Sequence, residues 1–325
     1  MIVTDVKWTD QGGETKEGFH MDPYLAENLH DTPKHLANDN DVVIIISARG
    51  GVRKGKSTFM MQIGYYLAWL QAGGKMHIER DEEGKLVTSY VKQKPTQPVH
   101  FGFENLVYSP NELISTAQGL YKKFGKHQII GYDETRGLDS AGTMSSVNKM
   151  LSEFFQFSGN LNHIYIIVIP DFFKLNESFC TSRSNFLIDI PKRKFFNFYG
   201  QKDKEWLYIK GKKKLSTTSR YLSQTPSFYG SFTKWIPFDK EEYEAQKIEK
   251  LKNANFGTRE QKMRQKMQAI LHILKTETTF TTKEIAEKVS GALFREVSTV
   301  SLENTLSNYN NFVKRHLKGG DVPEF

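Results

Sequence analysis

Apolar positions follow two different spacings along the chain from residue 42 onward. Val42 to Ile46 and Ile164 to Ile169 are continuous apolar runs rich in β-branched residues, which predicts buried strands. After the first run, apolar residues recur at helical spacing until two glycines end the pattern: Met60, Ile63, Leu67, Leu70, Gly73 and Gly74. Strands that alternate with helices predict an α/β domain with a mainly parallel sheet over residues 41–252.

The same pattern predicts the other elements of this part of the chain. We expect strands at 99–103 and 128–132, helices at 111–124 and 144–157, and an inserted hairpin at about 76–92. Residues 1–40 predict an N-terminal arm with a helix-like segment at 23–36. From about 191 to 238 the chain consists of short aromatic and basic segments such as Glu205 to Ile209 (EWLYI). We interpret them as strands of a basic, antiparallel extension of the sheet.

The C-terminal part of the chain has a different pattern. After a linker at 253–257, residues 258–325 resemble a small all-α, helix-turn-helix or winged-helix domain. Thr281 and Glu284 have the spacing of a capping box at a helix start. The third expected helix, at 299–314, is rich in Asn and Ser and is followed by Arg315 after Lys314, which suits either DNA binding or docking to another protein.

Composition sets the broad class. Of the 325 residues, 38% are hydrophobic and 25% are charged, and no apolar run approaches the ~20 residues that cross a membrane. The N-terminus lacks the basic-then-apolar order of a secretory signal, so we expect a cytoplasmic protein. Cys180 is the single cysteine, which excludes an internal disulfide and a thiolate zinc cluster.

The first strand leads into a complete phosphate-binding loop motif, Gly50-x-x-x-x-Gly55-Lys56-Ser57. Glycines let the backbone N–H groups wrap a phosphate chain, Lys56 supplies charge near the β- and γ-phosphates, and Ser57 can hold Mg²⁺. The implied ligand is a nucleoside triphosphate, and a glycine-rich turn without a ligand is the alternative. The expected binding residues are Gly50, Gly51, Val52, Arg53, Lys54, Gly55, Lys56, Ser57 and Thr58, with Arg53 and Lys54 also interpretable as solvent-facing charges.

A second motif follows the strand at 128–132. Asp133 and Glu134 stand at the carboxyl end of that strand, where α/β sheets bind ligands. We assign Asp133 to the Mg²⁺ shell and Glu134 to the attacking water. An acidic turn is the alternative. Because no guanine-reading Asn-Lys-x-Asp segment is present, we expect ATP hydrolysis rather than a GTP switch, and we rank hydrolysis above phosphoryl transfer to a metabolite.

Together these motifs resemble the RecA-like P-loop ATPases of the HerA/FtsK group and their zonular occludens toxin-like relatives on mobile elements. The resemblance covers roughly residues 20–250. It is carried by Gly50 to Ser57 and Ile129 to Glu134, followed by Gly137 to Ser140, Ser145, Asn148 and Ile166 to Phe173. It implies a RecA-like fold and an ATP-driven motor on DNA for packaging, translocation or transfer. It also implies a homo-oligomer, with a hexameric ring as one form.

Such rings complete their site with an arginine from the neighbouring subunit. Arg183 and Arg136 are the candidates, and we favour Arg183 because we expect it near the active edge of the sheet. A structural salt bridge is the alternative for both. Asn162 and Asp171, on either side of the strand at 164–169, are weaker candidates for a γ-phosphate sensor.

Charge points to a polyanionic partner. The net charge is +8, and Lys192 to Arg220 contains ten Lys or Arg against two acidic residues. We expect this segment and the C-terminal domain to contact DNA, although a solvated basic hairpin is the simpler reading of the charge alone. Aromatic residues in it are candidates for stacking on bases, with half expected in the core: Phe195, Phe196, Phe198, Tyr199, Trp206 and Tyr208.

Two functional hypotheses remain open from the sequence. The first is an oligomeric ATPase motor on DNA. The second is an ATP-gated DNA-binding or assembly switch with slow hydrolysis. A metabolite kinase ranks third, because the sequence indicates no binding site for an acceptor metabolite and this function would not explain the C-terminal domain.

Overall fold

The chain divides into two compact units, Met1–Leu251 and Lys252–Phe325. The computed structural model describes residues 2–9, 15–38, 40–49, 54–133, 151–155, 158–253, 281 and 283–285. Nearly all of these belong to the first unit.

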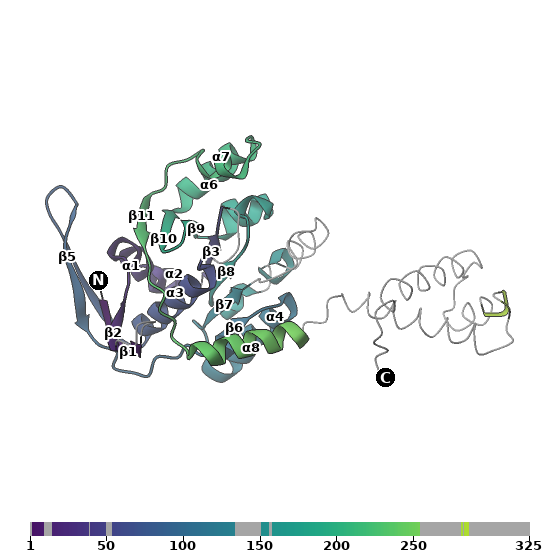
Figure 1. The fold of residues 1–325 in the computed structure, drawn as a ribbon, viewed down its shortest axis with the longest axis horizontal. Coiled ribbons are helices and arrows are strands. Elements are labelled where there is room, and N and C mark those ends of the chain that lie inside the picture. The colour runs from purple at the N-terminus through teal and green to yellow at the C-terminus, as the bar shows by residue number, and fades with distance from the viewer. Residues whose placement is uncertain are drawn as a thin grey trace. The chain divides into compact units, whose positions relative to one another are not determined.

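A seven-stranded sheet runs through the first unit (Figure 1). Its order is β11 (Phe228–Ser231), β10 (Phe195–Tyr199), β9 (Phe186–Lys192), β3 (Val42–Ser47), β8 (Ile164–Val168), β7 (Ile129–Asp133) and β6 (Leu106–Val107). The five strands from β9 to β6 pair in parallel, whereas β10 and β11 extend one edge in antiparallel pairs. The unit is therefore an α/β domain with a mostly parallel sheet, as predicted.

The sheet is buried on both faces because its strands are apolar on both sides. Val42, Ile44 and Ile46 pack into one core cluster, and Val43 and Ile45 pack into the other. The first cluster includes α1 (Pro23–His30) and α3 (Lys56–Gln71). The second includes α4 (Pro110–Phe124), residues 151–155, α6 (Gln201–Lys212) and α7 (Thr217–Tyr221).

Two hairpins and one more helix also belong to this unit. β4 (Lys75–Arg80) and β5 (Leu86–Gln93) pair in antiparallel at the position predicted for the inserted hairpin. β1 (Ile2–Thr9) pairs with β2 (Thr15–His20), and α2 (Thr32–Ala37) follows α1. Phe19 and Leu25 are buried in the first core cluster. The segment predicted as an N-terminal arm is thus part of the larger unit.

The segment EWLYI is helical, which corrects the prediction of a strand. It lies within α6, whose buried residues are Lys204, Leu207, Tyr208 and Gly211. Positions that are three, four and seven residues apart share one face of a helix, so the burial follows helical spacing. The strand prediction relied on five residues rich in aromatic and β-branched side chains, too short a window to exclude a helix.

In the second unit the described residues are few. The Thr281 N–H donates to the Glu284 carboxylate over 2.7 Å, and the Glu284 N–H donates to the Thr281 hydroxyl over 3.3 Å, so the predicted capping box forms. The other residues of the predicted helix-turn-helix lie outside the described residues.

Substitutions in α6 distinguish the helix from the predicted strand. Leu207→Ala should lower the free energy of unfolding by about 2–5 kcal/mol, because Leu207 is fully buried. Ile209→Ala should cost less than about 1 kcal/mol, because Ile209 is 44% exposed. Urea unfolding of the two variants measures the difference. Equal losses, expected if both side chains shared one face of a strand, would contradict the helix.

Candidate functional site

The end of the phosphate-binding loop adopts the conformation that glycine favours. Gly55 has a φ of 96° and stands immediately before α3. A Cβ at this position would lie 3.1 Å from the ring of Phe232, so a side chain would be both strained and crowded. Lys56, Ser57 and Thr58 then form the first turn of α3, whose positive end faces the loop.

Lys56 lies close enough to Asp133 for their charges to interact. Burial lowers the pKa of the Lys56 ammonium, while Asp133 acts in the opposite direction and favours the charged form. Asp133 is the last residue of β7 and is only 1% exposed. The lysine of the first motif and the aspartate of the second therefore meet at the carboxyl edge of the sheet.

A third segment, α8 (Lys240–Asn253), contributes to the same place. The Lys247 ammonium donates to the Asp133 carboxylate over 2.9 Å and lies 3.4 Å from the Tyr243 hydroxyl. Tyr243 also makes side-chain hydrogen bonds with Ser57 and Tyr108, and burial raises its pKa. Sequence reasoning missed these residues, because a Lys and a Tyr in a highly charged helix more than 100 residues from Asp133 carry no recognisable motif.

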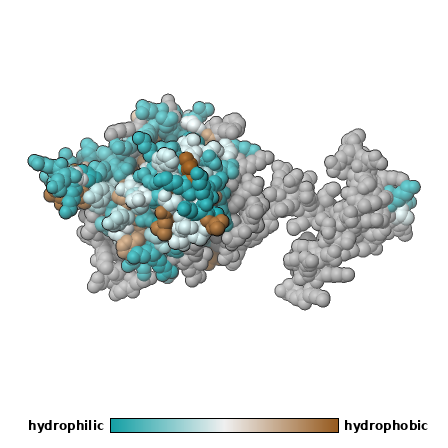
Figure 2. All heavy atoms as spheres, turned by 90° about the horizontal axis from the view of Figure 1, so that it is seen from above, coloured by the Kyte–Doolittle hydropathy of each residue, from teal (hydrophilic) through white to brown (hydrophobic). Residues whose placement is uncertain are grey.

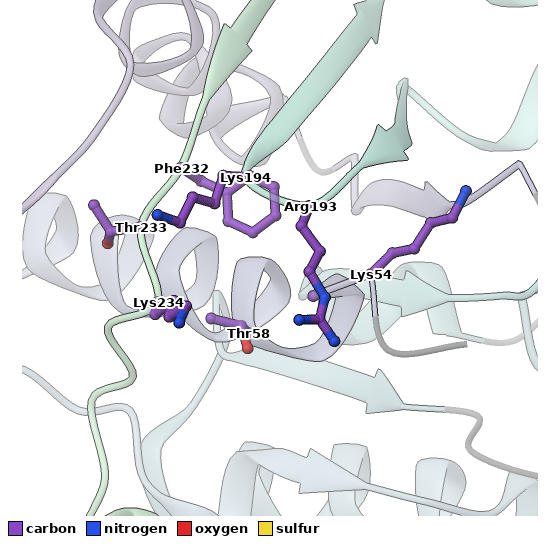
Figure 3. A pocket seen from close by; sticks show the side chains of 8 residues that line it. Lys54, Thr58, Arg193, Lys194, Phe232, Thr233 and Lys234 are labelled. Atoms are coloured by element: carbon purple, nitrogen blue, oxygen red, sulfur yellow. The ribbon is translucent and has the colours of Figure 1, made fainter. Parts of the chain in front are cut away.

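The Lys54 ammonium is bound by backbone carbonyls. It donates to the backbone carbonyls of Arg49 and Pro191, the latter over 3.0 Å. Figure 3 shows its amino end turned away from the cavity beside Thr58. Arg49 precedes the loop and Lys54 follows it, so the Lys54 side chain links the two ends of the loop. Its contact with Pro191 also links the loop to the end of β9.

A cavity of about 170 Å³ opens beside Gly55 and Thr58 (Figure 3). Arg193 and Lys194 stand in the turn between β9 and β10, and Figure 3 shows Arg193 extending toward Thr58 and Lys194 toward Thr233. Lys234 lines the cavity from the segment after β11. The full lining is Lys54, Gly55, Thr58, Arg193, Lys194, Phe232, Thr233 and Lys234. The lining contains cations and no acidic residue, which suits an anionic ligand.

Further polar residues join the ends of the strands next to β3. The Tyr221 hydroxyl lies 3.0 Å from the Ser47 hydroxyl and 3.3 Å from the Asp171 carboxylate. Arg49 donates to Asp189 over 2.6 Å, and burial raises the pKa of Asp189 to about 6 despite that arginine. This network holds Arg49, and with it the start of the loop, at the carboxyl edge of the sheet.

Arg183 and Asn162 lie at the opposite edge of the sheet, which corrects the expectation that Arg183 is near the active edge. Arg183 precedes β9 and forms an ion pair with Asp41, which precedes β3. Asn162 precedes β8, and its amide donates to the Leu36 carbonyl over 2.6 Å. The amino ends of parallel strands share one edge, so neither residue is near Lys56 within a subunit. Of the two sensor candidates, Asp171 alone follows its strand at the carboxyl edge.

Several predicted site residues lie outside the described residues. They are Gly50, Gly51, Val52 and Arg53 of the loop, and Glu134, Arg136, Gly137 to Ser140, Ser145 and Asn148 after β7. Their roles stay predictions.

The residues around Asp133 fit a magnesium ion accompanied by a nucleotide. Mg²⁺ is usually held by one or two carboxylates or hydroxyls together with phosphate oxygens and water, and Ser57 and Asp133 provide that donor set. Ser57 is hydrogen-bonded to Tyr243 and Asp133 to Lys247, and the polar atoms of these two α8 side chains lie 3.4 Å apart, so Ser57 and Asp133 border the same part of α8. Within the described ranges, no group of three or more His, Cys, Asp or Glu side chains is arranged to hold a metal by itself.

Comparison with known proteins assigns no family. No protein-family model matches the chain, and no curated protein matches it. In the described part of the chain, no helix combines the length and apolar character needed to cross a membrane.

Substitution of Arg183 separates a structural role from a catalytic one. Arg183→Ala should lower the free energy of unfolding by about 1–3 kcal/mol, because it leaves the buried Asp41 carboxylate without its cation. Nucleotide affinity should not change. Urea unfolding and titration with a fluorescent ATP analogue measure both, with Arg183→Lys as the charge-conserving control. Unchanged stability together with loss of ATP turnover would instead favour an arginine that acts on a neighbouring subunit.

Proposed function

We propose that this protein is a Mg²⁺-dependent ATP hydrolase that works as an oligomeric motor on DNA, in packaging, translocation or transfer. One observation carries the proposal: Lys56 and Ser57 of the phosphate loop converge with the buried Asp133 at one edge of the sheet. The parallel sheet brings both strand ends to this edge, and the combination of a lysine, a hydroxyl and a buried carboxylate there is the set that a nucleotide with Mg²⁺ requires.

Each residue has a defined task in this proposal. Lys56 neutralises the β- and γ-phosphates of ATP, and Ser57 and Asp133 hold the Mg²⁺ that accompanies the nucleotide. Glu134, the next residue along the chain, orients the attacking water. Bound Mg²⁺ supplies charge neutralisation at the transferred phosphoryl group. β8 lies between the loop strand β3 and the acidic strand β7, an order compatible with a RecA-like core.

The cationic cavity suits the rest of the nucleotide. It adjoins Thr58, one residue beyond the metal ligand Ser57, so a nucleotide whose terminal phosphates lie at Lys56 would extend toward it. Arg193 and Lys194 then neutralise charge on the α-phosphate side.

DNA is the proposed substrate of the motor because of the basic surface of α6 and α7. A cleft between these helices is lined by Lys210, Lys213, Lys214, Ser219, Leu222 and Ser223, again without an acidic residue. Trp206 is 53% exposed beside it, and the Lys210 ammonium lies 5.3 Å from the centre of its ring. Figure 2, which looks onto the molecule from above the view of Figure 1, shows a mainly hydrophilic face with separate hydrophobic residues.

Most of the predicted base-stacking residues are unavailable. Phe196, Phe198, Tyr199 and Tyr208 are buried in the core, one more than the half expected there, so these four cannot stack on bases. Trp206 and Phe195 are exposed and stay candidates.

One observation favours the second hypothesis, an ATP-gated switch with slow hydrolysis. Lys247 already contributes a cation to Asp133, so the metal must compete for this position. Slow basal turnover is the expected consequence.

ATP turnover with and without DNA tests the proposed function. Lys56→Ala should abolish hydrolysis, and Glu134→Gln should lower kcat by about 10²–10⁴-fold while nucleotide still binds. A coupled phosphate-release assay and an ATP-analogue titration measure the two effects. The switch hypothesis predicts instead ATP-dependent DNA binding that survives Glu134→Gln and no ATP-driven movement of DNA. Absence of turnover under all conditions, with Glu134→Gln indistinguishable from the native chain, would contradict the motor.

Replacement of the cleft lysines tests the DNA surface. Lys210, Lys213 and Lys214 changed together to Gln should weaken DNA binding and reduce the slope of log K against log salt by about 2–3, because three phosphate contacts are lost. Basal ATP turnover should stay unchanged. The control removes three exposed lysines elsewhere on the unit, Lys75, Lys122 and Lys123. An equal effect of both triple variants would show that the cleft is not a specific DNA surface.

A further inference from the structure

We propose that α8 is a displaceable gate over the magnesium position, in which the Lys247 ammonium takes the place of the metal at Asp133 and Tyr243 covers Ser57. The gate rests on the proposed function, because it assigns a competitor to the proposed metal site. It identifies a regulatory device that the two sequence motifs do not contain.

The contacts of α8 coincide with the two expected metal ligands. Lys247 reaches Asp133 over 2.9 Å, and Tyr243 is hydrogen-bonded to Ser57. The two α8 residues are one helical turn apart and lie 3.4 Å from each other through their polar atoms. One face of α8 therefore contacts both of the residues that are proposed to bind the metal.

Charge makes the two occupants mutually exclusive. A carboxylate that is 1% exposed needs a cation or strong donors nearby, and Lys247 meets this need in the absence of nucleotide. When a divalent ion binds Asp133, a lysine ammonium within 3 Å of the same carboxylate is repelled. Binding of the metal with its nucleotide must therefore move Lys247 away.

The anchoring of α8 is suited to such a movement. Just before the helix the chain is fixed to the core: Trp235 stacks on Phe19 at 4.2 Å, and Phe238 stacks on Phe103 at 4.5 Å between ring centres. Asp239 caps the helix start by accepting from the Glu242 N–H over 2.9 Å. Among the α8 side chains that the structure describes, Tyr243 is buried in the hydrophobic core, whereas Ile248, further along the helix, is 51% exposed. A movement of the helix about its fixed start would therefore break the apolar contacts of Tyr243 and leave those before the helix in place.

Nucleotide affinity in the full chain tests the gate. Lys247→Met keeps the length of the side chain and removes its charge, so it should bind a fluorescent ATP analogue with Mg²⁺ about tenfold more tightly than the native chain. With EDTA the two should bind the analogue equally. Lys240→Met, an exposed lysine at the start of the same helix, is the matched control and should change neither affinity. Tyr243→Phe should give a smaller gain in Mg²⁺-dependent affinity.

A second readout follows the helix directly. Mg²⁺ with a non-hydrolysable ATP analogue should accelerate tryptic cleavage within α8 of the native chain, and EDTA should abolish the effect. Affinity unchanged or weakened in Lys247→Met, with no change in cleavage, would overturn the gate. If the native chain binds no nucleotide and Lys56→Ala behaves identically, the proposed function itself fails. If binding depends on Lys56 but not on Lys247, the gate alone fails.

Discussion

The buried carboxylate of Asp133 is the constraint on which the site depends. Asp133, the last residue of β7, is buried, and a buried negative charge is tolerated when cations lie close to it. Two lysines do so from segments far apart in the chain: Lys56 at the start of α3 and Lys247 in α8. The carboxylate thereby joins the phosphate loop, the acidic strand and the last helix of the unit into one electrostatic cluster.

The parallel sheet decides which residues can take part in this cluster. The carboxyl ends of β3, β8 and β7 face one edge, so Gly55, Asp133 and Asp171 are collected there. Residues that precede the strands, such as Arg183 and Asn162, are carried to the other edge. Contacts on either side of the phosphate loop fix its position. Lys54, after the loop, donates to the carbonyls of Arg49 and Pro191, and the Arg49 side chain, before the loop, donates to Asp189.

Local patterns in the sequence predicted the parts of the site that depend on short-range chemistry. The strand before Gly50, the helix after Gly55, the β4–β5 hairpin and the Thr281 capping box are all encoded within a few residues. Two errors arose where the period or the direction of an element mattered. The aromatic residues of the EWLYI segment favour a strand although the segment is helical, and Arg183 lies at the amino edge of the sheet because it precedes its strand.

The contacts of α8 are of another kind, since they depend on packing between residues more than 100 positions apart. Neither Tyr243 nor Lys247 has a neighbour in the sequence that marks it. The sequence alone therefore predicts the phosphate loop and its acidic partner, and only the folded molecule indicates what covers them.

The most direct measurement is a structure of the full chain with Mg²⁺ and a non-hydrolysable ATP analogue. The account predicts the triphosphate at Lys56, the metal bound to Ser57 and Asp133, and Lys247 withdrawn from the Asp133 carboxylate. Nucleotide bound elsewhere, or no nucleotide at saturating concentration, would contradict the central claim that this edge of the sheet is an ATP site.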